Sequence, residues 1–137
     1  MSQPVIVSAA RTAIGTARKG TLAQTPAEDL ATAILTETVR RSGIDPERVD
    51  DVIFAEALYG GGDLARYAAV VAGMTGVPGL AVNRHCTGSL SSIGLAAAGI
   101  ASGMEKVVVA GGVQASSLSP RLTRRVPGTV DQLEPWY

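Results

Sequence analysis

The segment from Gly88 to Ser102 constrains the fold of this chain more than any other, because it has the length of a helix and contains no charged residue. Only Leu, Ile, Ala, Gly and Ser occur in it. A helix on a protein surface carries a polar or charged face, whereas a helix without such a face is normally buried on all sides. We therefore expect other elements to cover this helix all round.

The composition of the chain indicates close packing of its backbone. The 137 residues include 16 glycines and 21 alanines, but one Phe, one Trp and three Tyr. A domain of this size that builds its own core normally uses more large aliphatic and aromatic side chains. The sequence thus predicts elements that approach one another closely and a core that is completed partly by a partner surface.

Four apolar runs predict strands, and three segments with helical signals lie between them. The first helix begins at Thr25-Pro26-Ala27-Glu28, a capping box with proline at the first helical position, and ends at Gly43. The order βαβαβαβ predicts an α/β fold with a mostly parallel sheet flanked by helices. From Gln114 onward the periodicity stops, and we expect no regular structure there. The predicted strands lie at 5–7, 49–54, 80–82 and 107–112, and the other two helices lie at 64–72 and 88–102.

Charge and cysteine content exclude several classes of protein. Twelve basic and twelve acidic side chains balance, so we expect no nucleic-acid partner. The chain has a single cysteine, Cys86, and a single histidine, His85, which excludes an internal disulfide and a multi-cysteine zinc site. No apolar run reaches the roughly 20 residues of a membrane-spanning helix, and no basic leader precedes the first strand. We therefore expect no membrane span and a cytoplasmic location.

Cys86 is the candidate catalytic residue, because it stands between a predicted strand and the charge-free helix. At such a junction the free N–H groups and the positive end of the helix dipole stabilise a thiolate. The small residues Gly88 and Ser89 leave room for a substrate to approach the sulfur. The competing interpretation is that Cys86 only packs in the interior, as free cysteines often do.

The other acidic and basic groups do not form an obvious catalytic set. His85 is adjacent to Cys86, but neighbouring side chains in an extended segment point to opposite faces, so we favour a structural role for His85 over that of a base. The acidic pairs Asp50-Asp51 and Glu28-Asp29 fit a surface turn and a helix N-terminus.

A glycine run and a cluster of arginines are the two features that bear on phosphate binding. The glycines at 60–62 lack the lysine and the hydroxyl residue of a phosphate loop. Arg121, Arg124 and Arg125 either meet a phosphate-bearing ligand or, as we favour, are simply solvated. We therefore assign no phosphate site from these residues.

Five motifs follow one another along the chain. They are Val5-Ile6-Val7-Ser8-Ala9-Ala10-Arg11-Thr12-Ala13-Ile14-Gly15, Gly43-Ile44-Asp45-Pro46, Ala65-Arg66-Tyr67-Ala68-Ala69, Val82-Asn83-Arg84-His85-Cys86 and Val108-Val109-Ala110-Gly111-Gly112. Taken in this order, they resemble the N-terminal half of the thiolases, the coenzyme A-dependent acyltransferases of the acetyl-CoA acetyltransferase and 3-ketoacyl-CoA thiolase type. The resemblance covers nearly the whole chain. Ala13 stands where the family usually has proline, Thr87 follows the cysteine, and Gln114 stands where a glutamate is common; these departures bear on the nucleophile turn and on substrate preference.

The resemblance implies a Claisen condensation, or its reverse, the thiolytic cleavage of a 3-ketoacyl-CoA. In this reaction Cys86 is the nucleophile that carries the acyl thioester, and its backbone N–H helps to hold the oxyanion. Coenzyme A thioesters are then the substrates, no cofactor is bound permanently, and no metal is implied. The resemblance further implies a place in lipid metabolism, including fatty acid β-oxidation.

The resemblance also implies an organisation larger than this chain. Residues 1–113 correspond to the domain that carries the nucleophile, and residues 114–137 to the start of the region that covers the substrate. In the family, the histidine that activates the nucleophile, a second cysteine and the asparagine of an oxyanion site lie in the C-terminal half. We therefore expect the 137 residues alone to be inactive, and to need a C-terminal half in the same or another chain.

We expect the working assembly to be a homodimer or a homotetramer. Two other functions stay open at this point. One is a non-catalytic module that uses the same fold for assembly or ligand binding. The other is a ketosynthase-type condensing enzyme that acts on carrier-protein thioesters.

Overall fold

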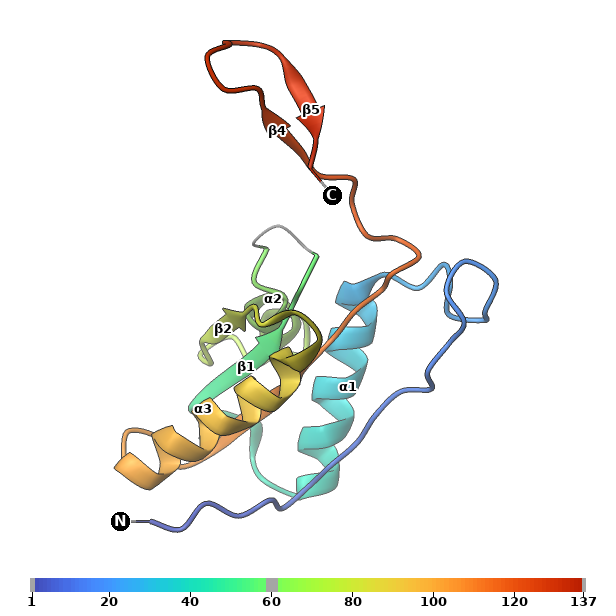
Figure 1. The fold of residues 1–137 in the computed structure, drawn as a ribbon. Coiled ribbons are helices and arrows are strands. Elements are labelled where there is room, and N and C mark those ends of the chain that lie inside the picture. The colour runs from blue at the N-terminus through green and yellow to red at the C-terminus, as the bar shows by residue number, and fades with distance from the viewer. Residues whose placement is uncertain (1, 59–61, 137) are drawn as a thin grey trace.

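The computed structural model describes residues 2–58 and 62–136. Within them, a three-stranded parallel sheet carries helices on both faces, and a two-stranded hairpin stands apart from this body (Figure 1). Two short 3-10 turns, η1 (Pro46–Arg48) and η2 (His85–Thr87), precede β1 and α3. The helices and strands are α1 (Ala27–Ser42), β1 (Asp51–Ala55), α2 (Leu64–Val71), β2 (Gly79–Val82), α3 (Gly88–Ser102), β3 (Val108–Gly112), β4 (Thr123–Arg125) and β5 (Leu133–Pro135).

The sheet has the order β2-β1-β3, with β1 in the centre and parallel to both neighbours. Ala55, the last residue of β1, is in register with Val82 at the end of β2 and with Gly112 at the end of β3. The carboxyl ends of the strands therefore meet at one edge of the sheet. This confirms the predicted α/β class, the parallel arrangement and three of the four predicted strands.

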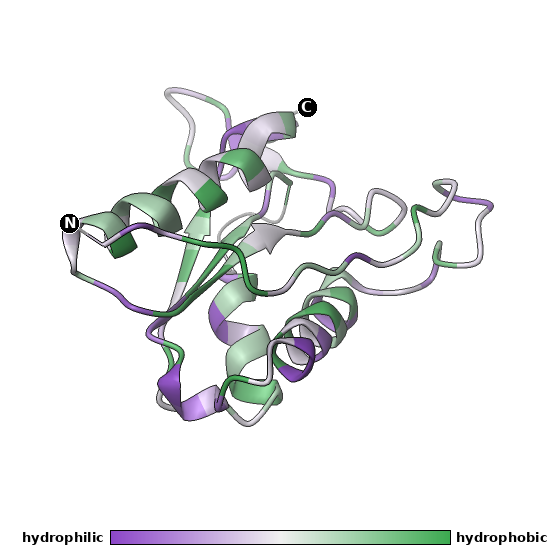
Figure 2. Ribbon diagram, turned by 90° about the horizontal axis from the view of Figure 1, so that it is seen from below, coloured by the Kyte–Doolittle hydropathy of each residue, from purple (hydrophilic) through white to green (hydrophobic). Residues whose placement is uncertain are grey.

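The main core lies between the sheet and the pair of helices α1 and α2. Leu35 of α1 and Val52 of β1 are fully buried there, and Phe54 is nearly so. Because side chains alternate along a strand, Val52 and Phe54 face α1 and α2 while Ala55 faces α3. The two views in Figures 1 and 2 show the resulting layers, with α3 on one face of the sheet and α1 and α2 on the other.

The helix boundaries agree closely with the prediction. Helix α1 begins one residue later than expected, so that Pro26 and not Thr25 is its cap residue, and no side-chain hydrogen bond is made at this cap. The helix ends before Gly43, whose φ of +67° is the left-handed conformation that favours glycine. Helix α2 ends at Val71, and Gly73 also has a positive φ, of +84°. The loop expected at 60–62 falls partly outside the described residues, which exclude 59–61.

The strand predicted at Val5–Val7 is wrong. These three residues belong to an extended segment with no strand assignment, and their exposed fractions are 70%, 81% and 64%. The segment runs beside α1, where Ser8 Oγ donates to the carbonyl of Thr38 at 3.0 Å (Figure 1). An apolar β-branched run becomes a strand only when a neighbour pairs with its backbone, and no described segment does so.

The prediction that regular structure stops at Gln114 is also wrong. Strands β4 and β5 pair antiparallel, and Arg124 lies opposite Glu134 with 2.7 Å between Nε and Oε1. The hairpin projects away from the sheet and helices (Figure 1). Its strands have three residues each and no alternation of apolar and polar residues, so they leave no periodic signal in the sequence.

Helix α3 is not buried on all sides within the described residues. Gly88, Ser92, Ala96 and Gly99 are buried against the rest of the chain, whereas Leu90 is 72% exposed. Ile93 and Leu95 are also exposed, and Figure 2 shows green, hydrophobic residues along this helix. One sheet covers one side of α3, and the described residues supply no second covering layer. None of the helices in these residues has the length and apolar content that a membrane crossing requires.

The first prediction concerns the core. Leu35→Ala removes a fully buried side chain and should lower the free energy of unfolding by about 2–5 kcal/mol, because it loses apolar burial and leaves a cavity. Thr36→Ala, at the exposed neighbouring position, should change it by no more than about 0.5 kcal/mol. Urea unfolding of both variants measures the difference, and equal stabilities would contradict this description of the core.

The second prediction uses two carboxylates near the amino ends of β1 and β3. Hydrogen bonds from the backbone N–H groups of Val107 and Lys106 lower the pKa of Asp50, whereas burial, with the charges of Asp51 and Asp50, raises the pKa of Glu105. A raised pKa means that protonated Glu105 stabilises the fold at low pH and that this contribution is lost as the pH rises above 4.5. A lowered pKa means that ionised Asp50 stabilises the fold above pH 3.8 and that this contribution is lost on acidification.

Glu105→Gln should therefore be more stable, relative to the unsubstituted protein, at about pH 7 than at about pH 3. Asp50→Asn should show the opposite dependence, with its largest loss of stability at about pH 7. Urea unfolding at the two pH values measures both effects. The same sign for both variants would contradict the opposite pKa shifts.

Candidate active site

Cys86 lies at the strand-to-helix junction that the sequence predicted. Strand β2 ends at Val82, the 3-10 turn η2 (His85–Thr87) follows, and α3 begins at Gly88. The side chain of Cys86 is exposed rather than packed in the interior. The thiol therefore stands at the carboxyl edge of a parallel sheet and beside the N-terminus of a helix of 15 residues, the position that favours developing negative charge.

The turn that carries Cys86 is held by side-chain and backbone hydrogen bonds on both sides of it. The carbonyl of Arg84 accepts from the backbone N–H of Thr87 at 3.1 Å and from Thr87 Oγ1 at 2.9 Å. The backbone N–H of His85 donates to Oδ1 of Asn83 at 3.0 Å, and Nδ2 of Asn83 donates to the carbonyl of Ala57 at 3.2 Å. These bonds link η2 to the segment that follows β1.

Small residues let the start of α3 lie directly on the sheet. A Cβ atom added to Gly88 would come within 2.5 Å of Cβ of Ala55, and one added to Gly112 would overlap Ser89 Oγ. Real Cβ atoms do not approach so closely, so glycine is required at both positions in this arrangement. Part of the glycine content noted in the sequence thus has its reason beneath the Cys86 turn.

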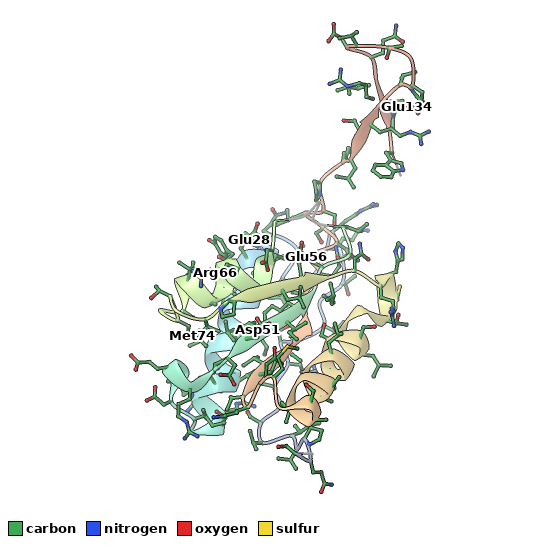
Figure 3. The ribbon with its side chains drawn as sticks, turned by 90° about the vertical axis from the view of Figure 1, so that its left-hand side faces the viewer. Glu28, Asp51, Glu56, Arg66, Met74 and Glu134 are labelled. Atoms are coloured by element: carbon green, nitrogen blue, oxygen red, sulfur yellow. The ribbon has the colours of Figure 1, made fainter. Side chains whose placement is uncertain are left out.

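Glu56, which the sequence did not single out, lies at the same edge of the sheet, directly after β1. Its side chain is 6% exposed, and Oε2 accepts from the backbone N–H of Leu64 at 2.8 Å. Asp63 accepts from the backbone N–H of Arg66, so two carboxylates hold the first turn of α2. Figure 3 labels Glu56 and Arg66 beside β1 and α2. The available signal was an acidic residue that directly follows the apolar run of β1.

Other charged residues singled out in the sequence lie elsewhere. Asp50 and Asp51 are at the amino end of β1, the opposite edge of the sheet from Cys86. Glu28 and Asp29 occupy the first turn of α1, as predicted. In the described residues no group of three or more His, Cys, Asp or Glu side chains is arranged to hold a metal ion.

The arginines of the C-terminal segment belong to the projecting hairpin and its approach. Arg124 pairs with Glu134, while Arg121 and Arg125 are exposed. A shallow, largely apolar groove does adjoin the nucleophile turn, but these arginines do not line it. Its volume is about 390 Å³, and it follows the exposed side of α3, lined by Arg84, Thr87, Leu90, Ser91, Gly94 and Leu95.

The sequence and the fold of this chain match a known family. The model of the family described as "Thiolase, N-terminal domain" matches residues 4–131. The chain therefore belongs to the thiolase family and corresponds to its N-terminal domain.

Particular relatives give the match more detail. An acetyl-CoA acetyltransferase of Cupriavidus necator is 39% identical over 134 residues, which are 96% of this chain and 33% of the relative. A cytosolic acetyl-CoA acetyltransferase of Mus musculus is 40% identical over 122 residues, 87% of this chain and 30% of the relative. The crystal structure of the Bacillus anthracis acetyl-CoA acetyltransferase superposes with a TM-score of 0.84 at 36% identity, covering 96% of this chain and 34% of that one. The chain thus spans about a third of the length of these relatives.

The third prediction tests the close contact beneath Cys86. Gly88→Ala should destabilise the protein and displace the start of α3, because its methyl group would collide with Ala55. Gly94→Ala, in the same helix, meets no atom within 4 Å and should be neutral or more stable by up to about 1 kcal/mol. Thermal unfolding, together with the rate at which iodoacetamide alkylates Cys86, distinguishes them. If the two variants behave alike, the contact between α3 and β1 is less close than described.

Proposed function

We propose that this chain is the nucleophile-bearing part of an acyl-CoA C-acyltransferase of the acetyl-CoA acetyltransferase type. The observation that carries the proposal is the exposed Cys86 in the turn before α3, at the carboxyl edge of the sheet, in a chain of the thiolase family. The alternative in which Cys86 is only a packing residue finds no support in an exposed thiol.

The proposed reaction has two stages that share Cys86. The Cys86 thiolate attacks the carbonyl carbon of an acyl-CoA, the carbon–sulfur bond to coenzyme A breaks, and coenzyme A leaves as a thiol after taking up a proton. A second acyl-CoA then loses a proton from its α-carbon and attacks the acyl thioester. A carbon–carbon bond forms, Cys86 leaves as thiolate, and the product is a 3-ketoacyl-CoA; thiolysis runs the same steps in reverse.

The local structure supports the role of Cys86 in both stages. Each attack converts a thioester carbonyl into an oxyanion, and backbone N–H groups at a helix N-terminus are suited to hold it. We assign the backbone N–H of Cys86 to this function. No permanently bound cofactor or metal is part of the proposed mechanism.

The remaining functional groups are proposed to come from a C-terminal thiolase half in the same or another chain. These are a histidine that activates the nucleophile, a second cysteine that acts as acid and base, and an oxyanion-binding asparagine. The exposed apolar side of α3 supports the need for a further layer. We also propose that the segment from 114 to the end of the chain begins the substrate-covering region, since its hairpin extends away from the domain formed by the preceding residues (Figure 1).

We also propose an assembly and a compartment for this protein. A homodimer or homotetramer would cover further exposed apolar residues, such as Tyr67 and Val71 on α2. A cytoplasmic location is supported by the cytosolic relative from Mus musculus. Analytical ultracentrifugation and fractionation of the host cell test these two points separately.

The fourth prediction tests the nucleophile directly. Brief exposure of the protein, produced from its own gene without truncation, to acetyl-CoA or acetoacetyl-CoA should add one acetyl group to the peptide that contains Cys86. Mass spectrometry locates the adduct, and Cys86→Ala should abolish it at this peptide.

Cys86→Ser serves as a matched control, because it keeps nearly the same size but replaces the thiol by a hydroxyl, which should acylate far more slowly. Absence of any acetyl adduct on Cys86 in the folded, unsubstituted protein would favour the non-catalytic module. Acylation by carrier-protein thioesters in place of coenzyme A thioesters would favour the ketosynthase-type enzyme.

A further inference from the structure

We propose that Asn83 is a positioning residue for Cys86, an inference that rests on the proposed function of Cys86 as the nucleophile. Its amide group joins the end of the sheet to the turn that holds the thiol. The oxygen of this amide accepts a hydrogen bond from the turn, and its nitrogen donates one to the segment that follows β1.

The nitrogen of Asn83 adds a hydrogen bond between the chain segments that follow β1 and β2. The backbone ladder at this edge ends with the N–H of Glu56, which donates to the carbonyl of Val82 at 3.1 Å. Asn83 is the next residue along, and its Nδ2 donates to the carbonyl of Ala57 at 3.2 Å. Beyond the last backbone hydrogen bond, the side chain of Asn83 therefore continues the link and holds Asn83 to the segment that follows the central strand.

The oxygen of Asn83 holds a backbone conformation that is otherwise unfavourable. His85 has a φ of +47°, in the left-handed region, which is unfavourable for a residue with a Cβ atom. Its backbone N–H donates to Oδ1 of Asn83, two residues earlier, at 3.0 Å. This is the Asx-turn pattern, in which an asparagine side chain stabilises the local turn.

The two bonds together determine where Cys86 stands. His85 immediately precedes Cys86, and both belong to η2, which closes through the bonds from Thr87 to the carbonyl of Arg84. A change of φ at His85 would rotate everything that follows, including the sulfur and the backbone N–H assigned to the oxyanion. The amide group of Asn83 therefore fixes the thiol relative to the sheet, because it is bonded to both the end of the sheet and the turn.

The same geometry explains why asparagine suits this position. One bond needs an acceptor and the other needs a donor, and a primary amide supplies both on a short side chain. Serine would keep an acceptor for the N–H of His85 but lacks the reach to Ala57. Alanine loses both bonds and leaves the strain at His85 without compensation.

The fifth prediction measures this role through the reactivity of Cys86. The rate of alkylation by iodoacetamide is followed as a function of pH on the protein without truncation, and mass spectrometry assigns the adduct to the Cys86 peptide. Asn83→Ala should slow alkylation at neutral pH by about tenfold, because the sulfur leaves its position at the helix N-terminus. Asn83→Ser should lie between Asn83→Ala and the unsubstituted protein.

A second substitution separates positioning from a general loss of stability. Glycine adopts a positive φ without strain, so the double variant Asn83→Ala with His85→Gly should recover most of the alkylation rate. His85→Gly alone provides the reference for this comparison. Urea unfolding of every variant shows whether the protein is folded, and Asn83→Ser carries the test if Asn83→Ala does not fold.

The outcomes distinguish this inference from the function on which it rests. If Cys86 in the unsubstituted protein reacts no faster than cysteine in an unfolded peptide, the proposed nucleophile is wrong and the role of Asn83 is overturned with it. If Cys86 reacts rapidly and the Asn83 variants react equally fast, only the role of Asn83 is overturned. If Asn83→Ala is slow and His85→Gly restores nothing, the left-handed turn is not the means by which Asn83 acts.

Discussion

The contact between the first residue of α3 and the last residue of β1 determines much of what surrounds the candidate nucleophile. Gly88 faces Ala55 so closely that a methyl group would not fit between them, and Gly112 of β3 approaches both Ala55 and Ser89. Helix α3 therefore starts directly on the sheet, rather than at the larger separation that bulky side chains impose. The turn before it, with Cys86, is held at the strand ends and remains exposed.

The same edge of the sheet collects the polar groups that order the site. Glu56 accepts from the start of α2, and Asn83 connects the segment after β1 to the turn of His85. On the far side of α3, however, Leu90 and Leu95 stay exposed in the described residues. The site is thus ordered on the side of the sheet and open along the exposed side of α3, in a chain that spans about a third of the length of its thiolase relatives.

Local sequence signals predicted correctly those elements that depend on residues close together in the chain. The proline near the start of α1, the glycine at its end and the apolar runs of β1 and β3 identified these elements, because such signals act within a few residues. They failed at Val5–Val7, where the pattern of a strand lacks a pairing partner in the described residues, and at the short hairpin of β4 and β5. They also missed Glu56 and Asn83, whose partners lie eight residues away in one case and 26 in the other.

The sequence by itself determined the helices, three strands of an α/β sheet and the location of Cys86 between a strand and a helix, and its motifs indicated the thiolase family before any contact was known. Only the tertiary structure decided the order β2-β1-β3, the exposure of one side of α3 and the hydrogen bonds that hold η2. The physical reason is that helix caps and strand patterns depend on neighbours in the chain. Sheet order, burial and the partners of a side-chain amide depend on segments that folding brings together.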